Sequence, residues 1–280
     1  MGGTLHERIA SARRTLAAAG IEDADAALDA DVLARHVLGW DRAALLVHGG
    51  DPAPPEFVER YEALITRRAG REPVAYITGV REFWERDFEV TPDVLIPRPE
   101  SELIVETVLG LVDRSRAVRI LDVGTGSGCL AVSLAAELPR ARVVATDVST
   151  AALRVARRNA ERHGVAGRIA WLRGDLLDPV AGPLDIVVSN PPYVVSRETL
   201  APEVGRHEPA GALYAGADGL AALRRLIPAA GPVLAPDGVF VVEFGFGQAD
   251  AVRSLAESAG WASVELRSDL QGILRVAVMS

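Results

Sequence analysis

The tetrapeptide Asn190-Pro191-Pro192-Tyr193 has the residue types needed to hold a flat amino group. It follows an apolar run, residues 184–188, that is typical of a strand buried on both faces, and ligands bind beyond the carboxyl ends of such strands. The two prolines remove two backbone donors and fix two φ angles, so the loop is stiff between an amide side chain and an aromatic ring. Taken alone, the tetrapeptide fits an ordinary proline turn as well as a binding site.

A glycine-rich turn supplies a second set of candidate residues. Residues 120–123 predict a strand that runs into Gly124, Gly126 and Gly128, and a helix follows directly. Glycines there let a ligand approach the backbone at a helix N-terminus, where N–H groups are exposed. Asp147 ends the next predicted strand, where its carboxylate can accept hydrogen bonds from both hydroxyls of a ribose. The combination predicts a nucleotide-type cofactor.

The spacing of the glycines distinguishes two cofactor classes. Dinucleotide-binding turns carry G-x-G-x-x-G, whereas this turn has glycine at every second position. The pattern favours S-adenosylmethionine (SAM) and disfavours an NAD-dependent oxidoreductase. Farther along, Asp175 and Leu176 follow a predicted strand where an adenine ring could lie, although a helix cap beside core leucines explains this pair equally well.

Together the two motifs predict methyl transfer to a planar nitrogen. Such an NH2 group is a poor nucleophile because its lone pair is delocalised, so its activation must be geometric. If the Asn190 oxygen and a prolyl carbonyl accept the two N–H bonds, the lone pair points at the SAM methyl, and positioning of this kind can supply roughly 7 to 11 kcal/mol. Tyr193 would stack on the flat substrate and exclude water.

The scaffold predicted for these motifs is a mostly parallel sheet covered by helices on both faces. The last two strands are too close in sequence for a helical crossover and should be antiparallel. Before the sheet, residues 4–69 carry apolar residues at helical spacing and predict a small helical bundle, whereas 73–79 and 83–90 suggest short extended segments that include a hairpin. The predicted strands are residues 118–123, 142–147, 168–173, 184–189, 238–243, 263–267 and 273–278. The predicted parts are a helical substrate-recognition domain (1–70), a linker with a hairpin (71–98) and a catalytic domain (99–280).

Composition restricts the partners of this 280-residue chain. Its net charge is -8, both halves are acidic, and all 30 basic residues are arginine, which argues against a nucleic-acid-binding module. The single cysteine, Cys129, excludes an internal disulfide, and no Cys/His pair has metal-ligand spacing, so we expect no bound metal. No apolar stretch approaches the roughly 20 residues of a membrane span, and the N-terminus lacks an apolar signal core. We expect a cytoplasmic monomer.

The motifs resemble those of class I SAM-dependent methyltransferases that act on planar nitrogens. Residues 94–102, Val-Leu-Ile-Pro-Arg-Pro-Glu-Ser-Glu, resemble the signature of the HemK/PrmC family, protein-(glutamine-N5) methyltransferases of peptide-chain release factors. Further matches at 73–79, 203–220 and 269–275 extend the resemblance over essentially the whole chain. It implies a Rossmann-like, seven-stranded catalytic domain whose last strand is antiparallel, preceded by the helical bundle.

The resemblance also implies the reaction, which is methyl transfer from SAM to the amide nitrogen of the glutamine in the Gly-Gly-Gln motif of class I release factors, during translation termination. Leu176 stands where many members have an aromatic residue, which leaves apolar packing on adenine, and Ser101 stands where threonine is usual. The implied cofactor-binding residues are Gly124, Thr125, Gly126, Ser127, Gly128, Asp147, Leu176 and Asn190. The implied catalytic residues are Asn190, Pro191, Pro192 and Tyr193.

Two alternatives belong to other functional classes. A DNA or RNA nucleobase amino-group N-methyltransferase would use the same two motifs, but the acidic balance and the lack of a recognisable base-recognition domain stand against it. A noncatalytic nucleotide-binding protein would not need the stiff tetrapeptide. The glutamine methyltransferase is therefore the leading hypothesis.

Overall fold

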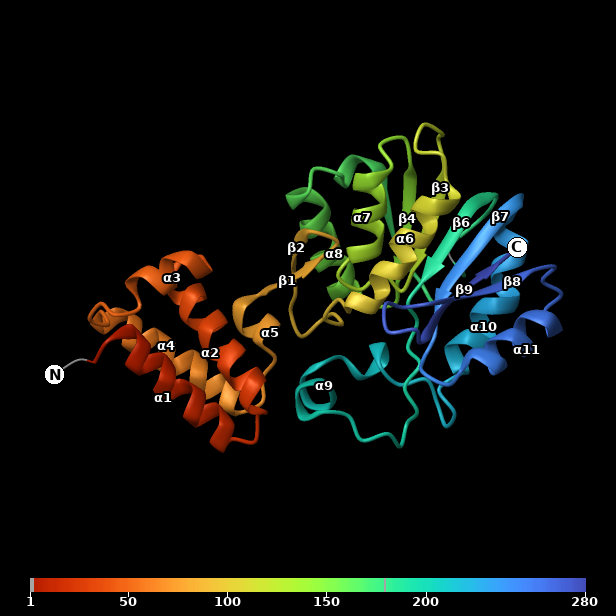
Figure 1. The fold of residues 1–280 in the computed structure, drawn as a ribbon. Helices are drawn as coiled ribbons and strands as arrows, with labels where there is room; N and C mark the ends of the chain where they lie inside the picture. The colour runs from red at the N-terminus through yellow and green to blue at the C-terminus, as the bar shows by residue number, and fades with distance from the viewer. Residues whose placement is uncertain (1–2, 179) are drawn as a thin grey trace. The chain divides into compact units, whose positions relative to one another are not determined.

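The computed structural model describes residues 3–178 and 180–280, and the chain divides into two compact units (Figure 1). The first unit extends to Gly79 and also includes residues 201–207, which the predicted boundaries assign to the catalytic domain. The second unit holds residues 80–200 and 208–280. Within the described residues, no helix is both long enough and apolar enough to cross a bilayer.

The first unit is built from helices, as predicted. The first helix begins at a capping box, in which the Thr4 hydroxyl and the Glu7 carboxylate bond each other's backbone N–H groups. Leu16 and Leu33 are fully buried in the core, where the Tyr61 hydroxyl donates to the carbonyl of Ala30 over 2.9 Å. The helices of this unit are α1 (Leu5–Ala18), α2 (Asp23–Leu38), α3 (Arg42–His48), α4 (Pro55–Ala69), α5 (Val74–Thr78) and α9 (Pro202–His207).

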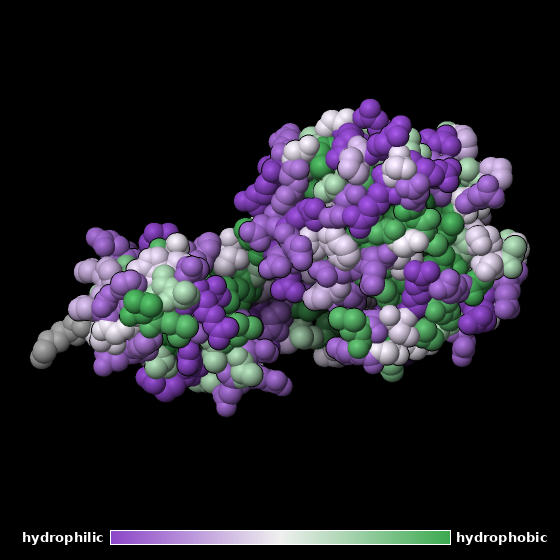
Figure 2. Space-filling view, turned by 45° about the horizontal axis from the view of Figure 1, so that its top comes forward, coloured by the Kyte–Doolittle hydropathy of each residue, from purple (hydrophilic) through white to green (hydrophobic). Residues whose placement is uncertain are grey.

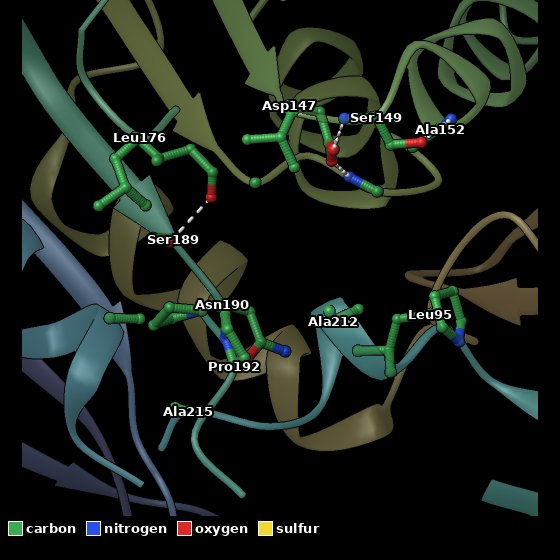
Figure 3. Close-up of a pocket in the computed structure, with 18 of the residues that line it drawn as sticks. Leu95, Asp147, Ser149, Ala152, Leu176, Ser189, Asn190, Pro192, Ala212 and Ala215 are labelled. Carbon is green, nitrogen blue, oxygen red and sulfur yellow. Dashed lines mark hydrogen bonds between the residues drawn. The ribbon is translucent and has the colours of Figure 1, made fainter. Parts of the chain in front are cut away.

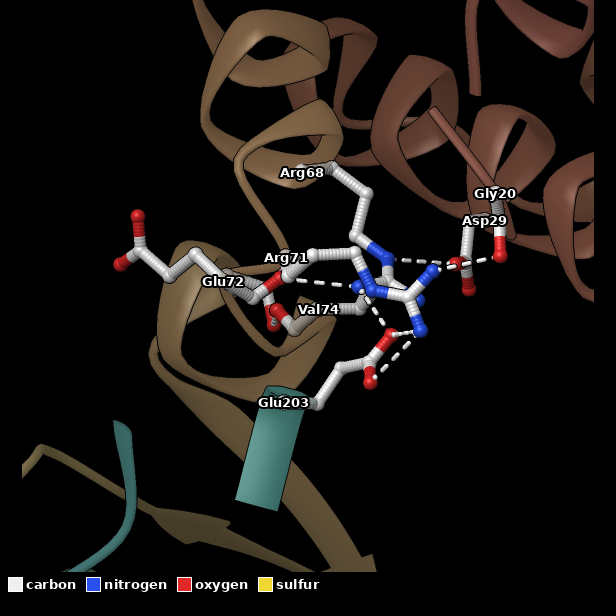
Figure 4. Close-up of polar contacts among 8 residues, drawn as sticks. Gly20, Asp29, Arg68, Arg71, Glu72, Val74 and Glu203 are labelled. Carbon is white, nitrogen blue, oxygen red and sulfur yellow. Dashed lines mark hydrogen bonds and ion pairs between the residues drawn. The ribbon is translucent and has the colours of Figure 1, made fainter. Parts of the chain in front are cut away.

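Ion pairs fasten α9 within the first unit (Figure 4). The buried Arg68 donates from Nε to Asp29 over 2.7 Å and from Nη1 to Glu203 over 3.0 Å. Arg71 donates from Nη2 to the other oxygen of Glu203, also over 3.0 Å. A buried guanidinium requires such partners, because an uncompensated charge in the interior is strongly destabilising. Glu203 therefore provides the charge that holds residues 201–207 in this unit.

The extended segment predicted for residues 73–79 is wrong, because Val74–Thr78 form the short helix α5. Pro73 precedes the helix, and Gly79 ends it with a φ of 75° in the left-handed region. The β-branched residues of this stretch favour extended structure, but Tyr76 and Ile77 are buried in the helical conformation. Packing therefore outweighs the local preference.

A hairpin is present in the second unit, but both of its strands lie after Gly79, so residues 73–79 are not its first strand as predicted. Strands β1 (Val80–Phe83) and β2 (Arg86–Glu89) pair antiparallel, and the two turn residues, Trp84 and Glu85, have φ angles of 50° and 55°. Positive φ at both central positions is the geometry of a tight two-residue hairpin turn.

A seven-stranded sheet forms the centre of the second unit, with the order β5-β4-β3-β6-β7-β9-β8. Strands β3 to β7 pair in parallel where they are neighbours, and β9 runs antiparallel to both β7 and β8, as predicted for the last strand. β7 begins four residues earlier than the predicted 238, with a register shift in its pairing to β6. The strands are β3 (Arg119–Val123), β4 (Arg142–Asp147), β5 (Ile169–Arg173), β6 (Leu184–Ser189), β7 (Leu234–Glu243), β8 (Val264–Ser268) and β9 (Leu274–Met279).

Helices cover the sheet on both faces (Figure 1). Alternate strand residues point to opposite faces, so Ile120 and Val188 pack with α6 and α7, whereas Leu121 and Val187 pack with α10 and α11. The helices of this unit are α6 (Glu102–Leu111), α7 (Cys129–Glu137), α8 (Thr150–Arg162), α10 (Ala221–Ala230) and α11 (Ala249–Ser258). Short 3-10 turns lie at Pro99–Ser101, Ala166–Arg168, Ala210–Ala212 and Gly231–Val233.

Candidate active site

Four parallel strands end at the same level along one edge of the sheet. The register pairs Thr146 with Val123, Val123 with Ser189, and Ser189 with Val242. The next residue of each strand or its loop therefore stands in one row at the carboxyl edge, where open parallel sheets bind ligands. In the order of the strands, this row is Asp147, Gly124, Asn190 and Glu243.

A cavity of about 430 Å³ opens along this edge within the second unit (Figure 3). Asp147 lies across it from Asn190 and Pro192, so the two sequence motifs face each other from opposite sides. The predicted site residues that line the cavity are Gly124, Gly126, Asp147, Leu176, Asn190, Pro191 and Pro192.

The glycines of the turn have two different roles. Gly124 and Gly126 have φ angles of 72° and 54°, and a Cβ added to either would meet no atom within 4 Å. Their backbone is therefore exposed and open to a ligand. Gly128 does not line the cavity, and a Cβ added there would lie 2.9 Å from the Cβ of Ala156 in α8. Its glycine permits close packing of the turn against that helix.

Thr125 and Ser127 are buried beside a smaller cavity of about 40 Å³. The Thr125 hydroxyl donates over 2.6 Å to Asp122, whose same oxygen accepts the backbone N–H of Ala131 over 3.2 Å. Burial raises the pKa of Asp122 to about 7. Asp122 thus joins the glycine turn to the first turn of α7 through these two hydrogen bonds. It was not among the predicted site residues.

Asp147 is bonded to the glycine turn that it faces. One carboxylate oxygen accepts the N–H of Gly126 over 2.9 Å, and the other accepts the N–H of Ser149 over 2.8 Å. Burial raises the pKa of Asp147 while these backbone bonds lower it, with a net increase from the ordinary value. The carboxylate is therefore held rigidly at the rim of the cavity.

Leu176 lines the cavity in a left-handed conformation, with a φ of 50°. Its carbonyl accepts the Thr146 hydroxyl over 3.1 Å, which fixes the turn. Asp175 is exposed and forms an ion pair of 2.7 Å with Arg225, and residues 174–178 form a turn, so the helix-cap explanation of Asp175 is wrong. Leu176 is available for an apolar contact.

A chain of hydrogen bonds fixes the acceptor side. Asn190 Nδ2 donates to Ser101 Oγ over 2.7 Å, and Ser101 Oγ donates to Glu243 Oε2 over 2.6 Å. The Tyr193 hydroxyl donates to Glu243 Oε1 over 3.1 Å, so its phenol is directed at Glu243, and Tyr193 does not line the cavity. Glu243 was not among the predicted site residues, although a charged residue at the end of an apolar strand is a signal that could have marked it.

The loop around the tetrapeptide is held from its other side. Gln248 Nε2 donates to the carbonyls of Tyr193 and Gly219 over 3.1 and 3.3 Å. A Cβ at Gly219 would lie 2.3 Å from the Tyr193 carbonyl oxygen, so only glycine fits there. Val194 pairs with Tyr214 in an isolated parallel bridge, which continues the support beyond the tetrapeptide.

The segment 94–98 borders the same cavities. Leu95 lines both, and the Ile96 N–H and the Arg98 guanidinium bond the two oxygens of the buried Glu208 over 3.0 and 2.5 Å.

Burial raises the pKa of the Cys129 thiol to about 12, so the thiol stays protonated and unreactive. Among the described residues, no cluster of His, Cys, Asp and Glu could hold a metal ion.

Known proteins resemble both parts of the chain. The PrmC N-terminal domain model matches residues 7–79, and the Methyltransferase small domain model matches residues 100–206. The release factor glutamine methyltransferase of Burkholderia pseudomallei (strain K96243) is 47% identical over 259 residues, which are 90% of each chain. The enzyme of the same name from Geobacter sulfurreducens is 43% identical over 267 residues, 94% of this chain and 92% of the relative.

Solved structures share the fold at low sequence identity. The human METTL16 catalytic domain, in complex with an RNA hairpin, superposes with a TM-score of 0.57 at 16% identity and covers 80% of each chain. The Thermus thermophilus 16S rRNA N2 G1207 methyltransferase, in complex with AdoMet and guanosine, has a TM-score of 0.53 at 19% identity, covering 72% of this chain and 49% of that one. These structures support the class I methyltransferase fold, and the relatives of 43–47% identity identify the family. The chain belongs to the release factor glutamine methyltransferases.

Proposed function

We propose that this enzyme transfers a methyl group from SAM to the side-chain amide nitrogen N5 of the glutamine in the Gly-Gly-Gln motif of class I release factors. The observation that carries the proposal is the orientation of the Asn190 amide. Its Nδ2 is committed to Ser101, so Oδ1 remains to accept a hydrogen bond from a substrate amide. The relatives of 43–47% identity are named release factor glutamine methyltransferases, which supports a glutamine of a release factor as the acceptor.

The cofactor side of the cavity fits SAM. The open backbone at Gly124 and Gly126 gives room for close approach, and each Asp147 oxygen, with one backbone bond made, keeps a lone pair for a ribose hydroxyl. Leu176 supplies apolar packing for the adenine ring. When bound, SAM would supply an electrophilic methyl group on a sulfonium sulfur, which leaves as a neutral thioether.

The acceptor side fits a flat amide. Asn190 Oδ1 and a carbonyl of the Pro191-Pro192 unit would accept the two N–H bonds of the glutamine side chain, which turns the nitrogen lone pair toward the cofactor side. The two prolines have no N–H to compete for those acceptors, and they keep the loop stiff. The chain therefore acts by orientation and exclusion of water. As the N–C bond forms, the S–C bond would break, and the methylated nitrogen would become strongly acidic and pass one proton to water as the product leaves, so no strong base is needed.

The proposal extends to the cellular setting. The first unit, which matches the PrmC N-terminal domain model, would recognise the release factor, and the enzyme would act as a monomer in the cytoplasm. The acidic net charge of -8 supports a protein substrate over a nucleic acid.

Methyl-labelled SAM tests the proposal directly. The purified protein is incubated separately with a class I release factor, with its Gln→Ala variant in Gly-Gly-Gln, and with duplex DNA. Label in the unchanged release factor alone is the expected result. Label in the Gln→Ala protein would place the methyl group elsewhere, and label in DNA alone would identify a nucleobase methyltransferase instead.

A further inference from the structure

Glu243 is a buried carboxylate that the proposed reaction does not use. Its side chain lies at the carboxyl end of β7, the residue is 1% exposed, and among the described residues it forms no ion pair within 4.0 Å. Burial of an unpaired charge is costly unless hydrogen bonds compensate it. The two donors that reach Glu243, Ser101 and Tyr193, both come from segments that border the acceptor site.

The hydrogen-bond chain has a direction that the carboxylate sets. An ionised carboxylate only accepts hydrogen bonds, so the Ser101 hydroxyl must donate its one proton to the hydrogen bond with Glu243. The Ser101 oxygen can then only accept from Asn190, which places Nδ2 toward Ser101 and Oδ1 away from it. The choice between the two possible orientations of the Asn190 amide therefore depends on a residue that touches neither substrate nor cofactor.

We propose that Glu243 is a positioning residue that, acting through the Ser101 hydroxyl, orients the Asn190 amide so that Oδ1 faces the substrate nitrogen, while it holds the Tyr193 end of the same loop. This inference rests on the proposed glutamine methylation. It adds to that function the group that determines which atom Asn190 presents.

Both oxygens of Glu243 are needed as acceptors, which gives the network a dependence on pH. Addition of a proton converts one oxygen into a donor, so either Ser101 or Tyr193 must reverse its bond. A reversed Ser101 bond would donate to the Asn190 amide and favour the rotated orientation, with Nδ2 toward the substrate. The groups facing Glu243 are Ser101 and Glu100 from the Pro99–Ser101 turn, Tyr193 from the tetrapeptide, Arg275 from β9 and Cys129 from α7.

The pKa of Glu243 places this change near neutrality. Burial raises the pKa to about 7, against the lowering effect of the bonds from Ser101 and Tyr193 and the charge of Arg275, whereas Glu100 raises it. The ionised, competent form therefore predominates above pH 7. Methyl transfer should rise with pH through that value.

The test compares single-turnover methylation of a Gly-Gly-Gln release factor at pH 6 to 9 in four variants. Ser101→Ala removes the relay and should lower the rate about 100-fold. Ser101→Thr keeps the hydroxyl and should restore most of the rate. Glu243→Gln keeps one acceptor and should lower the rate about tenfold while abolishing the pH step. The matched control is Ser133→Ala in α7. It removes a buried hydroxyl that forms no hydrogen bond among the described residues, and it should keep both the wild-type rate and the wild-type pH step.

The outcomes separate the inference from the function on which it rests. SAM affinity and thermal unfolding, measured for each variant, distinguish loss of positioning from loss of folding. A Glu243→Gln enzyme with the wild-type pH step, or a Ser101→Ala enzyme with the wild-type rate, would overturn the inference and leave glutamine methylation intact. A wild-type enzyme that fails to label the release factor would overturn the proposed function and the inference with it.

Discussion

The cofactor side and the acceptor side of the cavity each contain a loop braced by a buried carboxylate. Asp122 braces the glycine turn through Thr125 and Ala131, which lie three and nine positions away in the chain. Glu243 braces the tetrapeptide through Ser101 and Tyr193, which lie 142 and 50 positions away. The cofactor loop is therefore a local structure, whereas the acceptor loop is functional only after distant segments have come together.

Because of this difference, substitutions on the two sides should affect SAM binding and the rate of methyl transfer separately. The glycine turn is formed by one strand, one turn and one helix, and Asp147 and Leu176 complete the cofactor side from the ends of β4 and β5. Damage there should weaken binding of SAM. The acceptor side depends on an orientation assembled from several segments, so damage there should lower the rate of methyl transfer while SAM binding persists. Each variant below tests one side against the other.

The largest effect is expected from Asn190→Ala. The substitution removes the acceptor for the substrate N–H, and loss of one preorganised hydrogen-bonding group in an active site costs about 100- to 1000-fold in turnover. SAM affinity, measured by calorimetry, should change little because the contacts of Gly124 and Asp147 remain. Retained turnover would remove Asn190 from the acceptor site.

Asp147→Ala should give the converse result. It removes both the ribose acceptors and the bond that holds the Gly126 N–H, so SAM affinity should fall about 10- to 100-fold. Turnover at saturating SAM should recover most of the wild-type value, because the Asn190 orientation does not depend on Asp147. An equal loss of turnover at saturation would show that the two sides do not act separately.

The same contrast explains which features could be predicted from the sequence. The glycine turn and the tetrapeptide are each contiguous and follow an apolar strand, so both were found. Glu243 also ends an apolar strand, but its partner Ser101 lies in another motif, and no local pattern connects residues 142 positions apart. Contiguous sequence patterns therefore identify functional loops well. They do not identify side chains such as Glu243 that orient those loops from distant parts of the chain.

Elements of the fold follow the same rule. The seven strands were predicted to within a few residues because the central ones are apolar runs rich in β-branched residues that only a covered sheet can bury, whereas the edge strand β8 is short and largely polar. The predicted extended segment at 73–79 is wrong because its β-branched residues suggest a strand, whereas burial of Tyr76 and Ile77 favours a helix. The place of residues 201–207 in the first unit depends on Arg68 and Arg71, far away in sequence, and had no local signal.

A smaller effect, confined to stability, is expected from Asp122→Asn. Burial raises the pKa of Asp122 to about 7, above that of an unfolded aspartate, so the folded protein holds a proton that the unfolded chain releases. Stability from this group is therefore present at low pH and declines as pH rises toward 7. The asparagine variant lacks this decline. The Tm of the variant minus the Tm of the wild type should therefore be several degrees higher at pH 8 than at pH 5. A Tm difference that does not change with pH would exclude a proton on Asp122.

The smallest effect concerns the chain that leaves the acceptor loop. The glycine turn continues into α7 of its own unit, whereas the tetrapeptide leads through residues 194–200 to α9, which belongs to the first unit. Glu203→Gln removes the charge that pairs with Arg68 and Arg71, and Arg68 keeps Asp29 and the carbonyl of Glu72 as partners. Hydrogen exchange of residues 201–207 should accelerate, because α9 loses the ion pairs that fasten it.

The control for that measurement is Glu198→Gln, which removes an exposed carboxylate a few residues earlier in the same connection. It should leave the exchange of α9 unchanged, and in both variants the glycine turn should exchange as in the wild type. If α9 exchanged equally in the two variants, the Glu203 ion pairs would not be what fastens it. Faster exchange confined to Glu203→Gln would show that the acceptor loop, unlike the cofactor loop, continues into a segment held by side chains of the first unit.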